Sequence, residues 1–313
     1  AIMRWVLTTF PDIRPSKHFM LQVVEGGRVD VVDRSIGNWN VAGLNLLVWP
    51  TLLILSSLVK RRWRFAAGLA LLVVCMTITY LSEHQTSQLA IAASIAVFAL
   101  SCYASGVMRR VAMVSFVALV LGVVPLSQIA FQRLELQNAE WAQFTLKERF
   151  KIWGYSAAHV PKAPILGIGA NNTTIEQTQG LPSANSASAH PQTHHHPHNM
   201  ILQIWLELGA VGAGLLIIAG LMILRDISRM NPDAAPFGYA TAAMVFIQSV
   251  ATWDLWHVWV QAAFVMAFCM LFLGNRIVAV TTKSGSVIFA EIWLPDRLKF
   301  GRLCAAAQQK LKL

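Results

Sequence analysis

The stretch 200–224, MILQIWLELGAVGAGLLIIAGLMIL, is apolar almost throughout, with Glu207 as its one charged residue. A helix needs roughly 20 consecutive apolar residues to cross the hydrocarbon core of a bilayer, so this stretch predicts a transmembrane helix. Similar apolar stretches occupy residues 41–59, 65–82, 88–106, 111–130, 236–253 and 257–275. We therefore predict an all-α fold, a polytopic transmembrane helical bundle with about seven spans.

The composition supports a membrane protein over a large soluble protein with buried helices. Of the 313 residues, 56% are hydrophobic and only 13% are charged, and the mean hydropathy is +0.53. Soluble domains are usually about one quarter charged. The net charge of +10 would indicate a nucleic-acid partner in a soluble protein, but here the basic residues follow the apolar stretches. We predict membrane lipids as partners and no nucleic acid.

Lysine and arginine are concentrated in alternate loops, which is typical of loops on the cytoplasmic side of a membrane. The loops 82–87 and 254–256 contain neither residue type. The basic residues that follow the first, third, fifth and last spans are Lys60, Arg61, Arg62 and Arg64, Arg109 and Arg110, Arg225 and Arg229, and Arg276 and Lys283. This pattern places the N-terminal segment and residues 131–199 on the outer side and the C-terminal tail in the cytoplasm.

The topology divides the chain into five parts along the sequence. These are an outer segment at 1–40, four transmembrane helices in 41–130, a large outer loop at 131–199, three transmembrane helices in 200–275, and a basic cytoplasmic tail at 276–313. The large loop includes residues 139–160, AEWAQFTLKERFKIWGYSAAHV, whose pattern predicts an amphipathic helix. Because the chain starts on the outer side without a visible signal peptide, we expect a fragment that lacks earlier spans.

Histidines are clustered where the large loop enters the fifth span. A metal site would need three or four ligands in a defined geometry, and the prolines at 191 and 197 make the run His194–His196 irregular. We therefore predict a polar loop there and no metal. His198 differs because Asn199 can cap the helix that follows and hold the imidazole at the membrane surface. It is either a base that accepts a proton near pH 7 or an interfacial histidine satisfied by water or backbone.

Three segments resemble motifs of the bacterial O-antigen ligase family, a group that also includes the O-antigen polymerases. His198-Asn199, nine residues and then GAVG at 209–212 are similar to the family's His-Asn-x9-Gly-x-x-Gly pattern. The segments 149–172, RFKIWGYSAAHVPKAPILGIGANN, and 33–50, DRSIGNWNVAGLNLLVWP, resemble two further motifs. The resemblance covers residues 30–275. The stretch 81–90, LSEHQTSQLA, has no arginine where the family often has Ser-Arg, so no role is carried over to it.

The resemblance implies a glycosyltransferase in the bacterial inner membrane, multi-pass, with its active site facing the periplasm. Its donor would be an undecaprenyl-diphosphate-linked glycan and its acceptor a sugar hydroxyl of lipid A–core. His198 would act as general base, while Arg149 and Arg34 would bind the diphosphate through their planar guanidinium groups. Single displacement predicts inversion at the anomeric carbon. No cofactor or metal is expected, because the arginines can neutralise the leaving group. The alternative for Arg149 is a solvated surface charge, and the alternative for Arg34 is an anchor at the level of the lipid headgroups.

Supporting roles are predicted for Asn199 as the cap, for Arg133 as a source of positive field, and for Glu207. A carboxylate inside a span is costly unless it is paired or faces a cavity, and pairing with a polar group is the simpler expectation for Glu207. The other expectations are that Asp254 and His257 border the site, that Trp253, Trp256 and Trp259 form an aromatic belt, that Gly209 and Gly212 allow close helix packing, and that Gly167 and Gly169 form a turn.

Two other functions remain open from the sequence. The first is a polymerase that joins repeat units of O-antigen or exopolysaccharide, because the motifs belong to a group that includes both activities. The second is a transporter of a lipid-linked glycan or an ion. Transporters often place charges or broken helices at mid-membrane. The polar residues here gather in an outer loop instead, which favours the glycosyltransferase.

Overall fold

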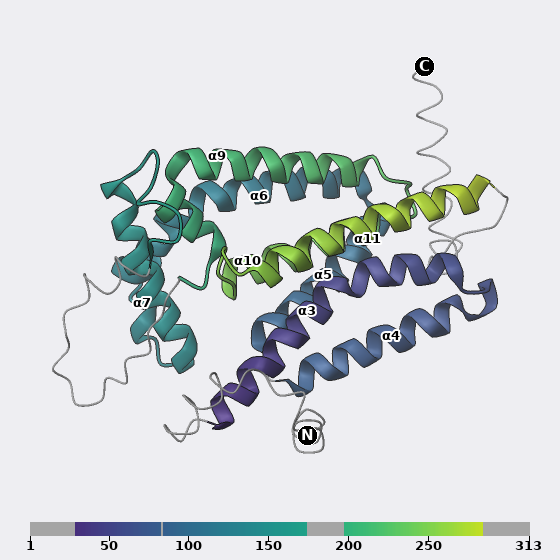
Figure 1. Cartoon of the computed structure of the whole chain (residues 1–313), viewed down its shortest axis with the longest axis horizontal. Helices are drawn as coiled ribbons and strands as arrows, with labels where there is room; N and C mark the ends of the chain where they lie inside the picture. Colours follow the sequence, from purple (N-terminus) through teal and green to yellow (C-terminus); the bar gives the residue numbers. More distant parts are fainter. Residues whose placement is uncertain (1–28, 83, 174–196, 284–313) are drawn as a thin grey trace.

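The computed structural model of this chain describes residues 29–82, 84–173 and 197–283 (Figure 1). Within these ranges the chain is helical and has no strand, which confirms the predicted all-α class. The elements are α3 (Val29–Leu58), α4 (Arg61–Leu81), α5 (Gln85–Tyr103), α6 (Ser105–Gln128), the π-helical turn η2 (Ile129–Arg133), the 3-10 turns η3 (Leu136–Asn138) and η4 (Val160–Lys162), α7 (Phe144–His159), α9 (Met200–Ser228), α10 (Ala235–Ala251) and α11 (Val258–Lys283).

Six helices in the described part of the chain are long and apolar enough to cross a membrane, one fewer than the seven spans expected. Their apolar segments are Trp39–Leu58, Arg62–Leu81, Gln85–Tyr103, Ser105–Arg133, Met200–Ser228 and Val258–Val280. The expected seventh span, 236–253, corresponds to the shorter helix α10. Its helix ends at Ala251 because Thr252 leaves the helical conformation, and the chain then turns inward to bond with α9.

The helices pack as a bundle in which α6 runs beside α9, and α11 runs beside α3 (Figure 1). Helix α10 lies against α5, α3 and α9, and most of its first half is buried. Trp49 of α3 is central to the largest core cluster. Its indole stacks on Phe98 at 4.8 Å between ring centroids and donates a hydrogen bond to Ser94 Oγ at 2.9 Å. Between membrane helices such contacts stabilise the bundle through van der Waals packing and hydrogen bonds rather than through removal of apolar surface from water.

The alternating helix directions give the bundle two chemically different ends. At one end lie the α4–α5 turn, α7, the start of α9 and the α10–α11 turn (Figure 1, left). At the other end lie the α3–α4, α5–α6 and α9–α10 turns, and Asn231 N donates to Asn275 Oδ1 at 2.9 Å to tie α9 to α11 there. The clustered lysines and arginines of the short loops belong to this second end, the one predicted to face the cytoplasm. We call the first end the α7 end.

Candidate functional site

Helix α9 begins at the α7 end with a capped and strained entry. Asn199 Oδ1 accepts a hydrogen bond from Leu202 N at 3.0 Å, so the side chain caps the helix as its position predicts. His198, the residue before the cap, has a φ of +52°. A positive φ is uncommon for a residue with a side chain, and such strain persists only where the surroundings enforce it. The imidazole is thus held in one place by the backbone on both sides.

The His198 ring has a defined orientation. Its Nδ1 lies 3.4 Å from the carbonyl oxygen of Thr252, at the end of α10. If Nδ1 carries the proton and donates to this carbonyl, Nε2 is the nitrogen with the lone pair and the one that can accept a proton. This is the arrangement that a general base needs.

Helix α7 connects this entry to the α4–α5 turn. Trp153 Nε1 donates to the carbonyl of Pro197, the residue before His198, at 2.8 Å. Arg149 lies four residues before Trp153, on the same face of α7 and about 6 Å along its axis. Its Nη1 donates to Thr86 Oγ1 at 3.4 Å. Arg149 is therefore placed at the α7 end together with His198, one helical turn from the residue that contacts the α9 entry.

The charge of Arg149 is partly withdrawn from solvent. Burial lowers the pKa of its guanidinium, yet an arginine remains protonated at neutral pH. Within the described ranges it forms no ion pair with a carboxylate. Its neighbour His84 has a pKa lowered to about 4, first by burial and second by the positive charge of Arg149. His84 is thus neutral near pH 7, and Arg149 supplies the positive charge of this region.

The other predicted cations and histidines are described to different extents. Arg34 falls in the first turns of α3, a helix whose side chains are described only from Trp39 onward. Arg133 is exposed at the end of η2. His190 and His194–His196 lie outside the described residues. Among the residues that are described, no group of three or more His, Cys, Asp or Glu side chains could hold a metal ion.

Glu207 is completely buried in α9 and is the acceptor of four hydrogen bonds. Asn171 N donates at 2.8 Å and Gln203 Nε2 at 3.1 Å, and the Thr173 hydroxyl and the Trp256 indole N–H donate as well. The expectation that Glu207 pairs with polar groups elsewhere is confirmed. These donors come from three segments: the loop after α7, α9 itself and the α10–α11 turn. Glu207 therefore joins the three segments that surround the entry of α9.

The network continues through Gln203, one turn earlier on α9. Its Nε2 also donates to Asp254 Oδ1 at 2.8 Å, and its Oε1 accepts from Leu255 N at 2.9 Å. Asp254 accepts from Trp256 N at 3.0 Å, and its other oxygen lies 3.4 Å from His257 Nδ1. Asp254 and His257 thus border the region as expected. Gln203 was not singled out from the sequence, although a polar residue four positions before Glu207 in an apolar stretch was an available signal.

Two glycines allow the loop after α7 to enter a break in α9. Gly209 has a φ of +61° and interrupts the helix, and Gly167 has a φ of +71°. Backbone bonds cross the break: Ile168 N to Leu206 O at 3.0 Å, Gly169 N to Glu207 O at 3.0 Å, and Ala210 N to Pro164 O at 2.9 Å. A Cβ at Gly167 would overlap the backbone of Glu207, and one at Gly209 would overlap that of Ile165. The turn predicted at Gly167 and Gly169 is confirmed.

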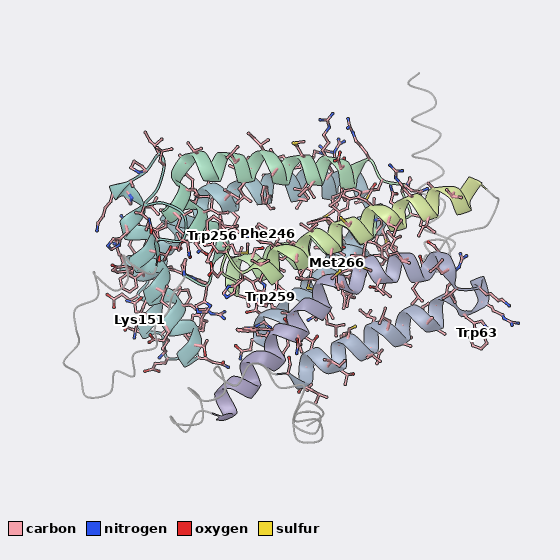
Figure 2. The ribbon with its side chains drawn as sticks, in the orientation of Figure 1. Trp63, Lys151, Phe246, Trp256, Trp259 and Met266 are labelled. Atoms are coloured by element: carbon pink, nitrogen blue, oxygen red, sulfur yellow. The ribbon has the colours of Figure 1, made fainter. Side chains whose placement is uncertain are left out.

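Two expectations about α9 and the tryptophans are wrong. Gly209 does not serve close packing between two continuous helices, because it is the break itself. Trp253 and Trp256 do not form an aromatic belt: Trp253 is 3% exposed and donates to Gln248 Oε1 at 3.2 Å, while Trp256 bonds to Glu207. Trp256 is half-buried, and Figure 2 shows it at the α7 end, where α10 meets α11. These indole N–H groups donate to polar acceptors within the protein. Residue type and spacing alone cannot distinguish a tryptophan with this role from one in an aromatic belt.

The stretch 81–90, to which no role was carried over, contributes Thr86 and His84 to the surroundings of Arg149. It lies more than sixty residues from Arg149 in the chain, so no local pattern pointed to it. The α7 end therefore combines the His198 imidazole, a half-buried guanidinium without a carboxylate partner in the described residues, and a polar hydrogen-bond network around Glu207. Such a set can move a proton and bind an anion.

Comparison with known proteins shows a similarity to one family. The family model described as O-antigen ligase matches residues 70–217, from α4 to α9, which include Arg149 and His198. Two curated proteins, each named as a "Putative polysaccharide ligase", are similar to the chain. The one from Rickettsia conorii is 27% identical over 221 residues, which is 69% of this chain and 52% of the relative. The one from Rickettsia felis is 25% identical over 220 residues, 69% of this chain and 53% of the relative.

A shorter match, 28% identical over 114 residues, links the chain to a protein of the same name from Rickettsia bellii, over 36% of this chain and 28% of the relative. The chain spans about half the length of the first two relatives. The matched residues include the break in α9 at Gly209, the loop after α7 that enters this break, and the start of α9. The chain is thus a multi-pass membrane protein whose residues 70–217 are similar to the O-antigen ligase family.

Proposed function

We propose that this chain carries the active site of an O-antigen ligase-like glycosyltransferase in the bacterial inner membrane. The enzyme moves a polysaccharide from undecaprenyl diphosphate to a sugar hydroxyl of lipid A–core at the periplasmic surface. One observation carries the proposal: α7 holds the half-buried Arg149 one turn from Trp153, whose indole bonds to the carbonyl that precedes His198. A cation and a base are therefore attached to one rigid element.

The reaction is a single displacement. His198 Nε2 accepts the proton of the acceptor hydroxyl while the hydroxyl oxygen forms a bond to the anomeric carbon of the glycan. The bond between that carbon and the diphosphate oxygen breaks, and its electron pair leaves with the diphosphate. The configuration at the anomeric carbon is inverted. The proton on His198 then passes to the diphosphate or to water, which restores the base.

Arg149 stabilises the leaving group. Its guanidinium forms two parallel hydrogen bonds with phosphate oxygens, and its partial burial strengthens the attraction, because the effective dielectric constant is lower than in water. Arg34 is proposed as a second diphosphate ligand, and Arg133 adds positive field from the end of η2. The supporting roles belong to Asn199, which fixes the height of His198, and to Glu207, which holds the surrounding segments together.

The test is transfer by the purified full-length protein, supplied with lipid-linked glycan and lipid A–core without ATP. His198→Ala is expected to reduce the rate by about 10²–10⁴-fold, the usual contribution of a general base. Arg149→Ala is expected to lose about 10²–10³-fold, and Arg149→Lys to recover part of this, because the charge remains but the two-pronged geometry is lost. Lys151→Ala is the matched control on α7: this lysine is exposed, and its ammonium lies 2.7 Å from Glu148 (Figure 2).

Other outcomes would favour the alternatives. Wild-type rates for both Arg149 variants would remove this residue from the site. Movement of the glycan across vesicles without formation of a conjugate would favour a transporter. In a deletion strain, loss of a ligase leaves full-length polymer on the lipid carrier, whereas loss of a polymerase leaves lipid A–core capped with a single repeat unit. The second pattern would favour the polymerase.

A further inference from the structure

A group of aromatic and polar side chains lies beside the proposed site and has no part in the displacement. Trp39 at the start of the apolar part of α3 is 44% exposed. Its ring centroid lies 6.1 Å from that of Trp259 on α11, with 30° between the planes, and 6.5 Å from that of His257. We call Trp39, Trp259, His257 and Asp254 the indole platform.

Three of the four platform members have contacts that fix their position. Trp259 packs edge-on against Trp253 at 4.6 Å, and Trp253 is buried. His257 Nδ1 lies 3.4 Å from Asp254 Oδ2, and Asp254 Oδ1 accepts from Gln203 Nε2 at 2.8 Å. The side chain of His257 is 43% exposed and that of Asp254 is 16% exposed. Aromatic faces and two polar groups of fixed position are therefore presented together.

The platform adjoins the proposed base. Thr252, whose carbonyl lies 3.4 Å from His198 Nδ1, stands two residues before Asp254 in the same turn. Gln203, which holds Asp254, lies one turn into the helix that His198 precedes. Trp253 and Met200 also share one small core cluster. A ligand that spans several ångströms could therefore contact the platform while its reacting atoms lie at His198.

We propose that the indole platform binds a pyranose ring of the glycan on which the enzyme acts. A pyranose has an apolar face of C–H groups, which fits an indole surface, and a rim of hydroxyls, which fits an imidazole and a carboxylate. Binding sites for such ligands combine an apolar wall with a few well-placed polar groups. The ligand class rests on the proposed function, since a glycan is its substrate. The ring belongs either to the acceptor or to the lipid-linked donor.

A membrane anchor is the competing explanation for exposed tryptophans near a membrane boundary. An anchor requires an amphipathic ring at headgroup level, but it does not require a carboxylate held by an amide from α9. Nor does it require a second indole beside the first, tilted by 30° from it. The fixed position of Asp254 and His257 beside the rings favours recognition of a polar ligand with one apolar face.

The experiment measures binding separately from transfer. Lipid-free core oligosaccharide and lipid-free O-polysaccharide are the probes, titrated calorimetrically into the full-length protein in nanodiscs. Trp39→Ala is expected to weaken one of the two by about tenfold, the loss for roughly 1.4 kcal/mol of contact, while Trp39→Phe retains most of it. If only the binding of the core oligosaccharide is weakened, the ring on the platform belongs to the acceptor. If only the binding of the O-polysaccharide is weakened, the ring belongs to the donor.

Trp141→Ala is the matched control, because Trp141 is 69% exposed and lies in the loop before α7, apart from the platform. His257→Asn provides a second variant if Trp39→Ala does not fold, and it is expected to weaken the same probe. The proposal would be overturned if Trp39→Ala and His257→Asn bound both probes as tightly as Trp141→Ala does. If Trp39→Ala also had a lower thermal midpoint, that result would favour the membrane anchor.

The two proposals fail separately. If the wild type binds a probe through Trp39 but forms no conjugate, the platform stands and the transfer reaction is wrong. If transfer is observed and the platform variants have unchanged KM values for donor and acceptor, the platform is wrong and the reaction stands.

Discussion

Replacement of Glu207 removes the acceptor on which donors from three segments converge. In Glu207→Ala, the donors Asn171 N, Thr173 Oγ1 and Trp256 Nε1 lose this partner, whereas Gln203 Nε2 keeps its bond to Asp254 at 2.8 Å. A buried donor without an acceptor costs about 1–3 kcal/mol. Three such donors together approach the whole stability of an ordinary domain, about 5–15 kcal/mol. We therefore expect Glu207→Ala not to fold.

Glu207→Gln keeps the shape and one acceptor oxygen. That oxygen best replaces Oε2, which accepts from Asn171 N and from the Trp256 indole, because neither of these donors can reverse its role. The new amide N–H₂ then faces the Thr173 hydroxyl, which can rotate to accept a hydrogen bond from it. It also faces Gln203 Nε2, which loses its bond to residue 207 but keeps its bond to Asp254 Oδ1. One hydrogen bond is lost, so the expected cost is about 1–3 kcal/mol.

Thermal unfolding of the purified full-length protein measures both variants, and hydrogen exchange reports on the joined segments. Glu207→Gln should lower the midpoint and increase exchange in residues 164–173 and 254–257. The control is Glu148→Gln on α7, whose exposed ion pair with Lys151 contributes about 0–1 kcal/mol. If Glu207→Gln and Glu207→Ala unfold at the same midpoint as Glu148→Gln, Glu207 does not hold these segments.

Further predictions concern the break in α9, the pH dependence of stability and metal ions. Gly209→Ala should destabilise the protein strongly, because the φ of Gly209 is +61° and a Cβ would overlap the backbone of Ile165. In the control Gly214→Ala on the same helix, the new Cβ meets no atom within 4 Å, so this variant should be neutral or slightly stabilising. Equal thermal midpoints for the two variants would contradict this prediction. Because the pKa of His84 is lowered to about 4 from an ordinary 6.5, the unfolded chain binds a proton in this window that the folded chain does not. The thermal midpoint of the wild type should therefore fall as the pH drops from 6.5 to 4, and His84→Gln should reduce that fall; an unchanged slope would show that His84 titrates normally. A chelator, and replacement of His194–His196 together, should leave the transfer rate unchanged, whereas loss that zinc restores would indicate metal ligands in that run.

The membrane helices could be predicted because hydrophobicity is a local property. Each apolar stretch can be recognised from its own residues alone, and the amphipathic pattern of residues 139–160 predicts α7 in the same way. The helix cap at Asn199 and the turn at Gly167 and Gly169 also follow from residue type at one position. The length of α10 could not be predicted, because its end at Ala251 depends on bonds from the following turn to Gln203.

The surroundings of the predicted site residues needed the fold. His198 and Arg149 were selected from motif and charge, and their roles remain proposals, but nothing local connects Arg149 with Thr86 or His198 with Thr252. Trp256 illustrates the limit: an indole near a predicted membrane boundary is typical of a belt, yet its N–H satisfies a buried carboxylate far away in the chain.

The sequence by itself determined which segments are apolar enough to cross a membrane, which loops carry positive charge and which residue types gather in the large loop at 131–199, since these depend on composition within one stretch. Only the tertiary structure decided that α9 is broken at Gly209, that a loop occupies the break, and that Glu207 receives donors from three segments. The physical reason is that a buried hydrogen bond depends on the distance and direction between two groups, whatever their separation along the chain. Hydrophobicity requires no partner, whereas a hydrogen bond always does.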